Sequence, residues 1–201
     1  ISATQLLGAA MPKLGMEPIR RQALVKATIA EIGQHGTLDV TVSQIARRAG
    51  MSSALAHHYF GGKEQIFVAA MRYTMGVYAA EVRGALAMAD TPAERVEAII
   101  RASFSSRNFR VETVAAWMNF YVLAQVSPEA KRLLNVYHRR LRSNLAHGLR
   151  PLVKTRAEMV ASRVAALIDG VYLRQSLGEA APNGARALEQ IMGYVQLELD
   201  Q

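Results

Sequence analysis

The 201-residue sequence contains no cysteine, which excludes a disulfide framework and any metal site built on thiolates. It also lacks an uninterrupted run of about 18 apolar residues, so no membrane-spanning helix is expected. The apolar residues 1–10 have no basic lead and make a poor secretory signal, so we predict a cytoplasmic protein.

Signals of catalysis are equally scarce. No glycine-rich phosphate loop follows a strand, because no segment reads convincingly as a strand, and no serine stands in a nucleophile elbow. The five histidines include no pair four residues apart, and the adjacent His57 and His58 point to different sides of a helix. We therefore expect no enzyme, no metal site and no cofactor.

Helical periodicity covers nearly the whole chain, and 51% of its residues are hydrophobic, which is enough for a sizeable core. This pattern predicts an all-α fold. The expected helices include residues 18–35, a long helix over about 63–88, and a basic helix that opens at 127–128 and reaches about residue 149. Thr155 is expected to cap the next helix in a capping box with Glu158.

Residues 41–64 carry the clearest pattern in the chain. Thr41 and Gln44 have the spacing of a capping box at the start of one short helix. Gly50 is placed to end that helix, and Ser52 can cap a second one after a tight turn. This order predicts a helix-turn-helix unit that fits the major groove of DNA, although a generic helical hairpin has the same outline.

The second helix of this unit, residues 52–59, has the side chains expected of a recognition helix. Small residues near its start allow a close approach to base edges, whereas its end can bind phosphates. The candidates for base edges are Ser53, Ala54, Leu55 and His57, and those for phosphates are His58, Tyr59 and Lys63.

With the helix before it, this segment resembles the tetracycline-repressor (TetR) family of one-component regulators. The matching positions are Thr41, Ile45, Ala46, Ala49, Gly50, Ser52, Tyr59, Phe60 and Lys63. The resemblance implies an N-terminal helix-turn-helix domain that binds operator DNA, and a C-terminal helical domain for effector binding and dimerisation. It also places Arg20 near the DNA backbone, so Arg20, Thr41 and Ser52 join the candidate DNA-binding residues. We expect an N-terminal extension over 1–17 and domains over 18–64 and 65–201.

A narrower resemblance, to choline-responsive repressors within this family, runs from residue 11 to about 180. It is carried by the segments MPKLGMEPIRRQAL, QIARRAG and AALIDGVYLR. The resemblance implies choline as the effector and genes of choline uptake and glycine betaine synthesis as the target. Two alternatives stay open: a TetR-type repressor of an efflux or other gene with a different cationic or lipophilic effector, and a helical ligand-binding or scaffold protein that does not read DNA.

Aromatic residues are few, at 6% of the chain, and several fall where an effector would bind. A quaternary ammonium cannot donate hydrogen bonds, so aromatic faces and a nearby carboxylate hold it instead. Packing in the core is the competing interpretation for each ring. The candidate effector-binding residues are Phe104, Glu112, Trp117, Phe120, Tyr121, Asp169 and Tyr172.

The last third of the chain suggests two surfaces. Two C-terminal helices carry apolar stripes, and the family resemblance implies that they pair with their copies in a homodimer, although both stripes can also be used within one subunit.

The net charge is +8, and residues 131–163 hold nine basic residues and one acidic residue. This excess predicts either a surface that attracts DNA or acidic helices, or an ordinary solvated helix face.

Overall fold

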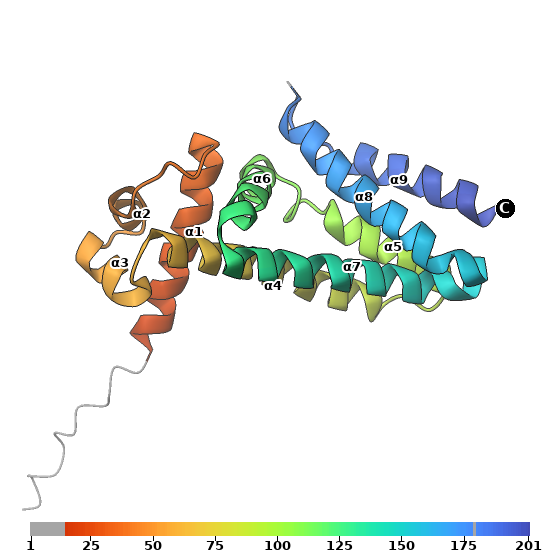
Figure 1. Ribbon diagram of the computed structural model, residues 1–201, viewed down its shortest axis with the longest axis horizontal. Helices are drawn as coiled ribbons and strands as arrows, with labels where there is room; N and C mark the ends of the chain where they lie inside the picture. Colours follow the sequence, from red (N-terminus) through yellow and green to blue (C-terminus); the bar gives the residue numbers. More distant parts are fainter. Residues whose placement is uncertain (1–14, 179) are drawn as a thin grey trace, which may run out of the picture.

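A computed structural model describes residues 15–178 and 180–201, and these residues form helices joined by short loops, with no strand among them (Figure 1). The all-α prediction is therefore confirmed. The helices are α1 (Met16–His35), α2 (Val42–Arg48), α3 (Ser53–Phe60), α4 (Lys63–Leu86), α5 (Pro92–Ser103), α6 (Val111–Val126), α7 (Pro128–Val153), the 3₁₀ turn η1 (Lys154–Arg156), α8 (Ala157–Ser176) and α9 (Gly184–Leu199).

The three N-terminal helices gather at one end of the molecule, and α8 and α9 lie toward the other end (Figure 1). The long helices α4 and α7 run between these ends, and α6 lies close to α1. The expected extension over 1–17 falls mostly outside the described residues, and α1 already begins at Met16. The expected division between residues 64 and 65 falls within the first turn of α4 and stays a prediction.

The expected end of α7 near Leu149 is wrong, because the helix continues through Gly148 and Pro151 to Val153. A Cβ at Gly148 would lie 2.9 Å from Cγ2 of Val96, so this glycine allows α5 to pack closely on α7 rather than ending the helix. Pro151 lies in the last turn, where it removes one backbone hydrogen bond while Leu149 and Val153 stay buried. Burial of this turn outweighs the local preference of proline.

The expected capping box at Thr155 and Glu158 is also wrong. Residues 154–156 form a 3₁₀ turn, and α8 begins at Ala157 with no side-chain cap. Lys154 adopts a left-handed φ of 51°, which turns the chain sharply between α7 and α8. Glu158 instead forms an ion pair with Arg150, 3.1 Å away.

Helix α1 packs unusually close to α6. A Cβ added to Gly33 would lie 2.6 Å from Cβ and 2.7 Å from Cα of Glu112, so only glycine fits without a shift of one helix. Nearby, the side-chain amide of Asn119 donates a hydrogen bond of 3.3 Å to the carbonyl oxygen of Gly36, at the end of α1. These contacts join the N-terminal helices to the rest of the molecule.

Among the described residues, no helix is both long and apolar enough to cross a membrane. Within the same part of the chain, no group of three or more His, Cys, Asp or Glu side chains is placed to hold a metal ion.

Candidate functional site

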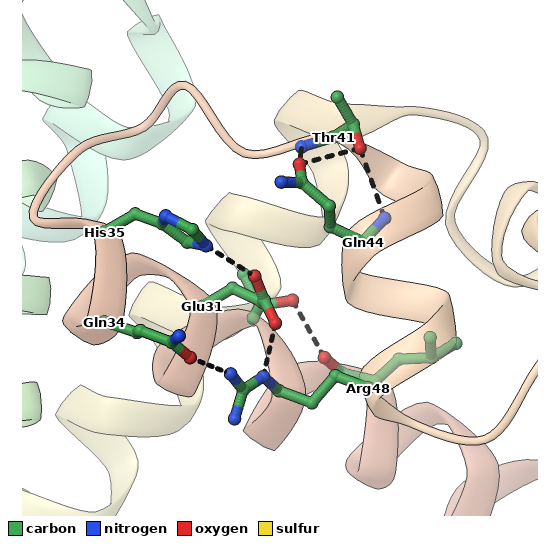
Figure 2. Close-up of polar contacts among 8 residues, drawn as sticks. Glu31, Gln34, His35, Thr41, Gln44 and Arg48 are labelled. Atoms are coloured by element: carbon green, nitrogen blue, oxygen red, sulfur yellow. Dashed lines mark hydrogen bonds and ion pairs between the residues drawn. The ribbon is translucent and has the colours of Figure 1, made fainter.

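The capping box expected at the start of α2 is present. Thr41 Oγ1 accepts a hydrogen bond of 3.2 Å from the backbone N–H of Gln44, and Gln44 Oε1 accepts one of 2.7 Å from the backbone N–H of Thr41 (Figure 2). Two N–H groups that a helix start leaves without partners are thereby satisfied. The capping box therefore fixes where α2 begins.

The turn between α2 and α3 also follows the expected pattern. Gly50 has a φ of 68°, a left-handed conformation that glycine adopts without strain. Ser52 Oγ then accepts a hydrogen bond of 3.2 Å from the backbone N–H of Leu55 and caps α3. The hydroxyls of Ser43 and Ser53 lie 3.0 Å apart and join the two helices. Together, α2 and α3 form a helix-turn-helix unit.

A partly buried ion pair, which was not predicted from the sequence, attaches this unit to α1. Glu31, only 6% exposed, receives a hydrogen bond from the guanidinium of Arg48, which also donates to Gln34 (Figure 2). His35 Nε2 lies 3.2 Å from the second carboxylate oxygen of Glu31. Because a buried carboxylate is costly without partners, these contacts hold α2 in one position on α1.

The outer face of α3 is open to a partner, whereas Ala56 on its inner face is fully buried. Arg21 of α1 lies over the rings of Tyr59 and Phe60, with its guanidinium carbon 5.5 and 5.2 Å from their centroids, and joins α1 to the end of α3. Among the candidate DNA-binding residues, Arg20, Thr41, Ser52, Ala54, His57 and His58 are exposed, and Ser53, Leu55, Tyr59 and Lys63 are half-buried.

Two aromatic clusters occupy the C-terminal domain. In the first, Trp117 of α6 packs against Phe120 and Tyr121 of its own helix, with ring centroids 6.3 and 6.4 Å away. Its nearest ring is Tyr137 of α7, at 4.8 Å, a residue that was not among those predicted from the sequence. Nothing in the local spacing links residues 117 and 137, because they lie on different helices.

A carboxylate borders this first cluster. The hydroxyl of Tyr121 donates a hydrogen bond of 2.8 Å to Oδ1 of Asp169 on α8. His138 of α7 stacks on Tyr121, with centroids 6.1 Å apart, and its Nε2 lies 3.5 Å from Oδ2 of Asp169. This buried nitrogen has no hydrogen bond to the residues that the structure describes. The arrangement combines aromatic faces with one negative charge, which suits a cation.

Burial controls the protonation of this region. Desolvation raises the pKa of the Asp169 carboxyl above its ordinary value, although the Tyr121 hydrogen bond and His138 oppose the shift. Burial and the nearby Asp169 raise the pKa of Tyr121, so its hydroxyl keeps its proton and remains a donor. Burial likewise raises the pKa of Tyr78, which packs edge-on against Tyr137, to about 12.

The second cluster consists of Phe104, Phe109 and Tyr172. Their ring centroids lie between 4.8 and 5.6 Å apart. The buried hydroxyl of Tyr172 donates to the carbonyl oxygens of Ser103 and Asn108, the latter at 3.3 Å. Phe104 and Tyr172 therefore pack mainly with each other and with Phe109, a ring that the sequence analysis did not include.

Glu112 lies apart from both clusters. It stands exposed in the first turn of α6, against Gly33 of α1, and lines a pocket of about 550 Å³ with basic side chains that include Lys26 and Arg107. Of the two carboxylates considered for an effector, the structure therefore places only Asp169 beside the rings.

A groove of about 770 Å³ lies between α7 and α8, with Asp169 and His138 in its wall. Four basic residues of α7 also line it: Lys131, Arg132, Arg139 and Arg142. Several large apolar side chains are exposed on α8, directly after it and on α9, namely Met159, Leu173, Leu177 and Leu197.

Comparisons with known proteins agree with this arrangement. A family profile described as bacterial regulatory proteins of the tetR family matches residues 24–70, and one described as BetI-type transcriptional repressor, C-terminal, matches residues 92–200. The HTH-type transcriptional regulator BetI of Rhizobium meliloti (strain 1021) is 56% identical over 190 residues, which cover 94% of each chain.

Solved structures share the fold. A protein from Pseudomonas aeruginosa PAO1 described as a transcriptional regulator has a TM-score of 0.77 and 26% identity, covering 90% of this chain and 91% of its own. Another, from Saccharomonospora viridis and crystallised with choline, has a TM-score of 0.77 and 18% identity, covering 89% of this chain and 96% of its own. From the two profiles and the curated relative, the chain belongs to the TetR family of bacterial regulatory proteins and is a DNA-binding transcriptional repressor with a BetI-type C-terminal domain.

Proposed function

We propose that this repressor controls genes of choline uptake and glycine betaine synthesis, and that choline releases it from its operator. The observation that carries the proposal is the Asp169 carboxylate beside the rings of Tyr121 and Trp117. A trimethylammonium group is attracted to both features. It packs against aromatic faces, and because it has no N–H donor, the charge of a carboxylate holds it rather than a hydrogen bond to a neutral acceptor. The BetI-type C-terminal match and the choline complex of the Saccharomonospora protein support this choice.

The effector site in this proposal is formed by Trp117, Phe120, Tyr121 and Asp169, with Tyr137 and His138 added from α7. Phe104 and Tyr172 of the second cluster belong to this proposal as supporting residues. Burial, with Tyr78 and Asp169 nearby, raises the pKa of the Tyr172 hydroxyl, which therefore keeps its proton. Glu112 takes no part in holding choline.

The DNA interface in this proposal is the exposed face of α3 with the starts of α1 and α2. Ser53, Ala54, Leu55 and His57 approach base edges, whereas the phosphates are bound by Arg20, Thr41, Ser52, His58, Tyr59 and Lys63. A homodimer presents two such faces, and a palindromic operator would match them with half-sites about 34 Å apart or a multiple of this distance.

The homodimer would form through α8 and α9. On these helices Met159, Leu173 and Leu197 stay exposed in one subunit, as does Leu177 directly after α8, and a two-fold partner would cover them. Helix α6 is suited to carry the effector's influence to DNA, because it holds Trp117 and also contacts α1 through Glu112. The requirement is that choline and DNA favour different arrangements of the dimer.

The test is a titration of the DNA upstream of the protein's own gene at fixed salt, with and without choline, against a scrambled duplex. We expect tight binding to the native duplex and a loss of affinity when choline is added. His58→Ala, which removes an exposed side chain of α3, should weaken DNA binding and spare choline binding. Asp169→Asn should do the reverse.

Two outcomes would contradict the proposal in different ways. Tight DNA binding that choline does not affect, but bulky lipophilic cations do, would favour a repressor of an efflux gene. Equal and weak binding to both duplexes would contradict operator recognition by this surface altogether.

A further inference from the structure

The groove between α7 and α8 has a charge pattern that choline alone does not use. Lys131, Arg132, Arg139 and Arg142 line it from one face of α7, at successive intervals of one, seven and three residues along the helix. Asp169 is the one carboxylate in its wall. A ligand that enters this groove therefore meets one negative charge surrounded by an excess of positive charge.

The four groove cations are not paired with carboxylates. Arg150 pairs with Glu158, and Arg156 and Arg163 both pair with Glu198. None of the four groove cations forms an ion pair with any residue that the structure describes, and the same is true of Arg140 and Lys154 outside the groove. The facing wall on α8 has the small side chains Ser162, Ala165 and Ala166, and Asp169 is the carboxylate that it presents.

The cations of the groove begin close to its carboxylate along α7. His138, 3.5 Å from Asp169, marks the level of the carboxylate on this helix. Arg139 is the next residue, and Arg142 lies four residues beyond His138, about one helical turn or 6 Å along the axis at 1.5 Å per residue. The groove therefore offers a carboxylate for an ammonium group and, within about one turn of α7, cations for an anionic group.

We propose that the groove between α7 and α8 binds the anionic end of a zwitterionic quaternary ammonium, such as a choline ester of phosphate, whose ammonium group lies at Asp169. The inference rests on the proposed function, because it uses the same ammonium site. Arg139 and Arg142 bind the anionic oxygens through charge-assisted hydrogen bonds, and the Ser162 hydroxyl can donate another. Choline itself occupies only the Asp169 end.

The experiment is a calorimetric titration of the full-length repressor with choline, phosphocholine and inorganic phosphate, at low and fixed salt so that exposed charges are not screened. We expect phosphocholine to bind about ten times more tightly than choline, which is the effect of one net charge-assisted contact. Inorganic phosphate should bind much more weakly than phosphocholine, because it lacks the ammonium group.

Variants with equal changes in net charge locate the contact. Arg142→Gln should remove most of the advantage of phosphocholine over choline and leave choline affinity unchanged. Arg140→Gln is the matched control, because Arg140 is an exposed residue of α7 outside the groove, and it should leave the advantage intact.

Three results would overturn the inference: phosphocholine that binds no tighter than choline, phosphate that binds as tightly as phosphocholine, or an equal loss in Arg140→Gln and Arg142→Gln. Failure of the proposed function is distinguishable, since in that case choline itself would not bind the unaltered protein.

Discussion

The helix-turn-helix unit and the C-terminal helices α5–α9 are each stabilised internally by polar contacts, but the contacts differ in how far apart their residues lie in the sequence. In the helix-turn-helix unit, Thr41 bonds to Gln44 and Ser52 bonds to Leu55, each three residues away. Among the C-terminal helices, Tyr121 reaches Asp169 across 48 positions of the chain, and Tyr172 reaches the Ser103 carbonyl across 69. The first region therefore takes its local shape from neighbouring residues, whereas the second requires the whole bundle to be assembled.

These two regions meet at the contact between α1 and α6. Disrupting this contact should lower the free energy of unfolding more than any other change considered below. Gly33→Ala would place a Cβ 2.6 Å from that of Glu112, so one helix must move. We expect a loss of about 1–3 kcal/mol in the free energy of unfolding, as for other overpacked sites. Urea denaturation followed by circular dichroism measures it.

Gly76→Ala in α4 is the control for this prediction, because nothing lies within 4 Å of a Cβ built there. It should stabilise the protein by about 0.5–1 kcal/mol through the better helix propensity of alanine. A Gly33→Ala variant as stable as Gly76→Ala would show that the two regions are not in rigid contact.

The helix-turn-helix unit and α5 each begin with a capping box of the same design. Thr41→Ala and Thr91→Ala each remove a hydroxyl that accepts a backbone N–H, from Gln44 in α2 and from Glu94 in α5. Each should lower the free energy of unfolding by about 1 kcal/mol. Only Thr41→Ala should also weaken operator binding in a gel-shift titration, because α5 lies outside the DNA-binding unit. Equal effects on DNA would mean that overall stability, rather than the position of α2, governs recognition.

The smallest expected change near neutral pH is the pH dependence of stability and choline affinity that arises from Asp169. Burial raises the pKa of its carboxyl above the ordinary value of 3.8, so the folded protein holds this proton more tightly than the unfolded chain does. Ionised Asp169 therefore destabilises the fold above its raised pKa, and this cost disappears as the pH falls through it. Choline affinity should fall over the same interval, by at most about tenfold per pH unit.

Calorimetric titrations with choline at a series of pH values test this effect of Asp169. The Asp169→Asn variant should bind choline weakly and without that pH dependence. A variant that retains the wild-type pH profile would assign the titration to another group.

The range of the contacts also explains which features the sequence could predict. Thr41, Gly50 and Ser52 were predictable because caps and left-handed turns depend on a few consecutive residues. The ion pair between Glu31 and Arg48 was not, because it joins residues 17 positions apart on different helices. Among the C-terminal helices, the rings of α6 were predictable as a set, whereas Tyr137 and His138 could be added only after α7 was placed beside them.

The two wrong predictions at the end of α7 have the same origin. Gly148 and Pro151 interrupt helices in isolation, but here the buried contacts of Leu149 and Val153 with the bundle maintain the helix past both. Thr155 has the spacing of a cap, yet the sharp turn at Lys154 leaves it in a 3₁₀ segment. Local preference was overridden by tertiary packing in both cases.

The hydrogen bond from Tyr121 to Asp169 has a consequence for sensing under the proposed function. The tyrosine hydroxyl already donates to this carboxylate and offsets part of its negative charge, so an ammonium group meets a weakened attraction. The strength of this internal hydrogen bond would then shift the effector concentration at which half of the repressor responds. A single side-chain contact can in this way adjust the response threshold without altering the part of the pocket that recognises the effector.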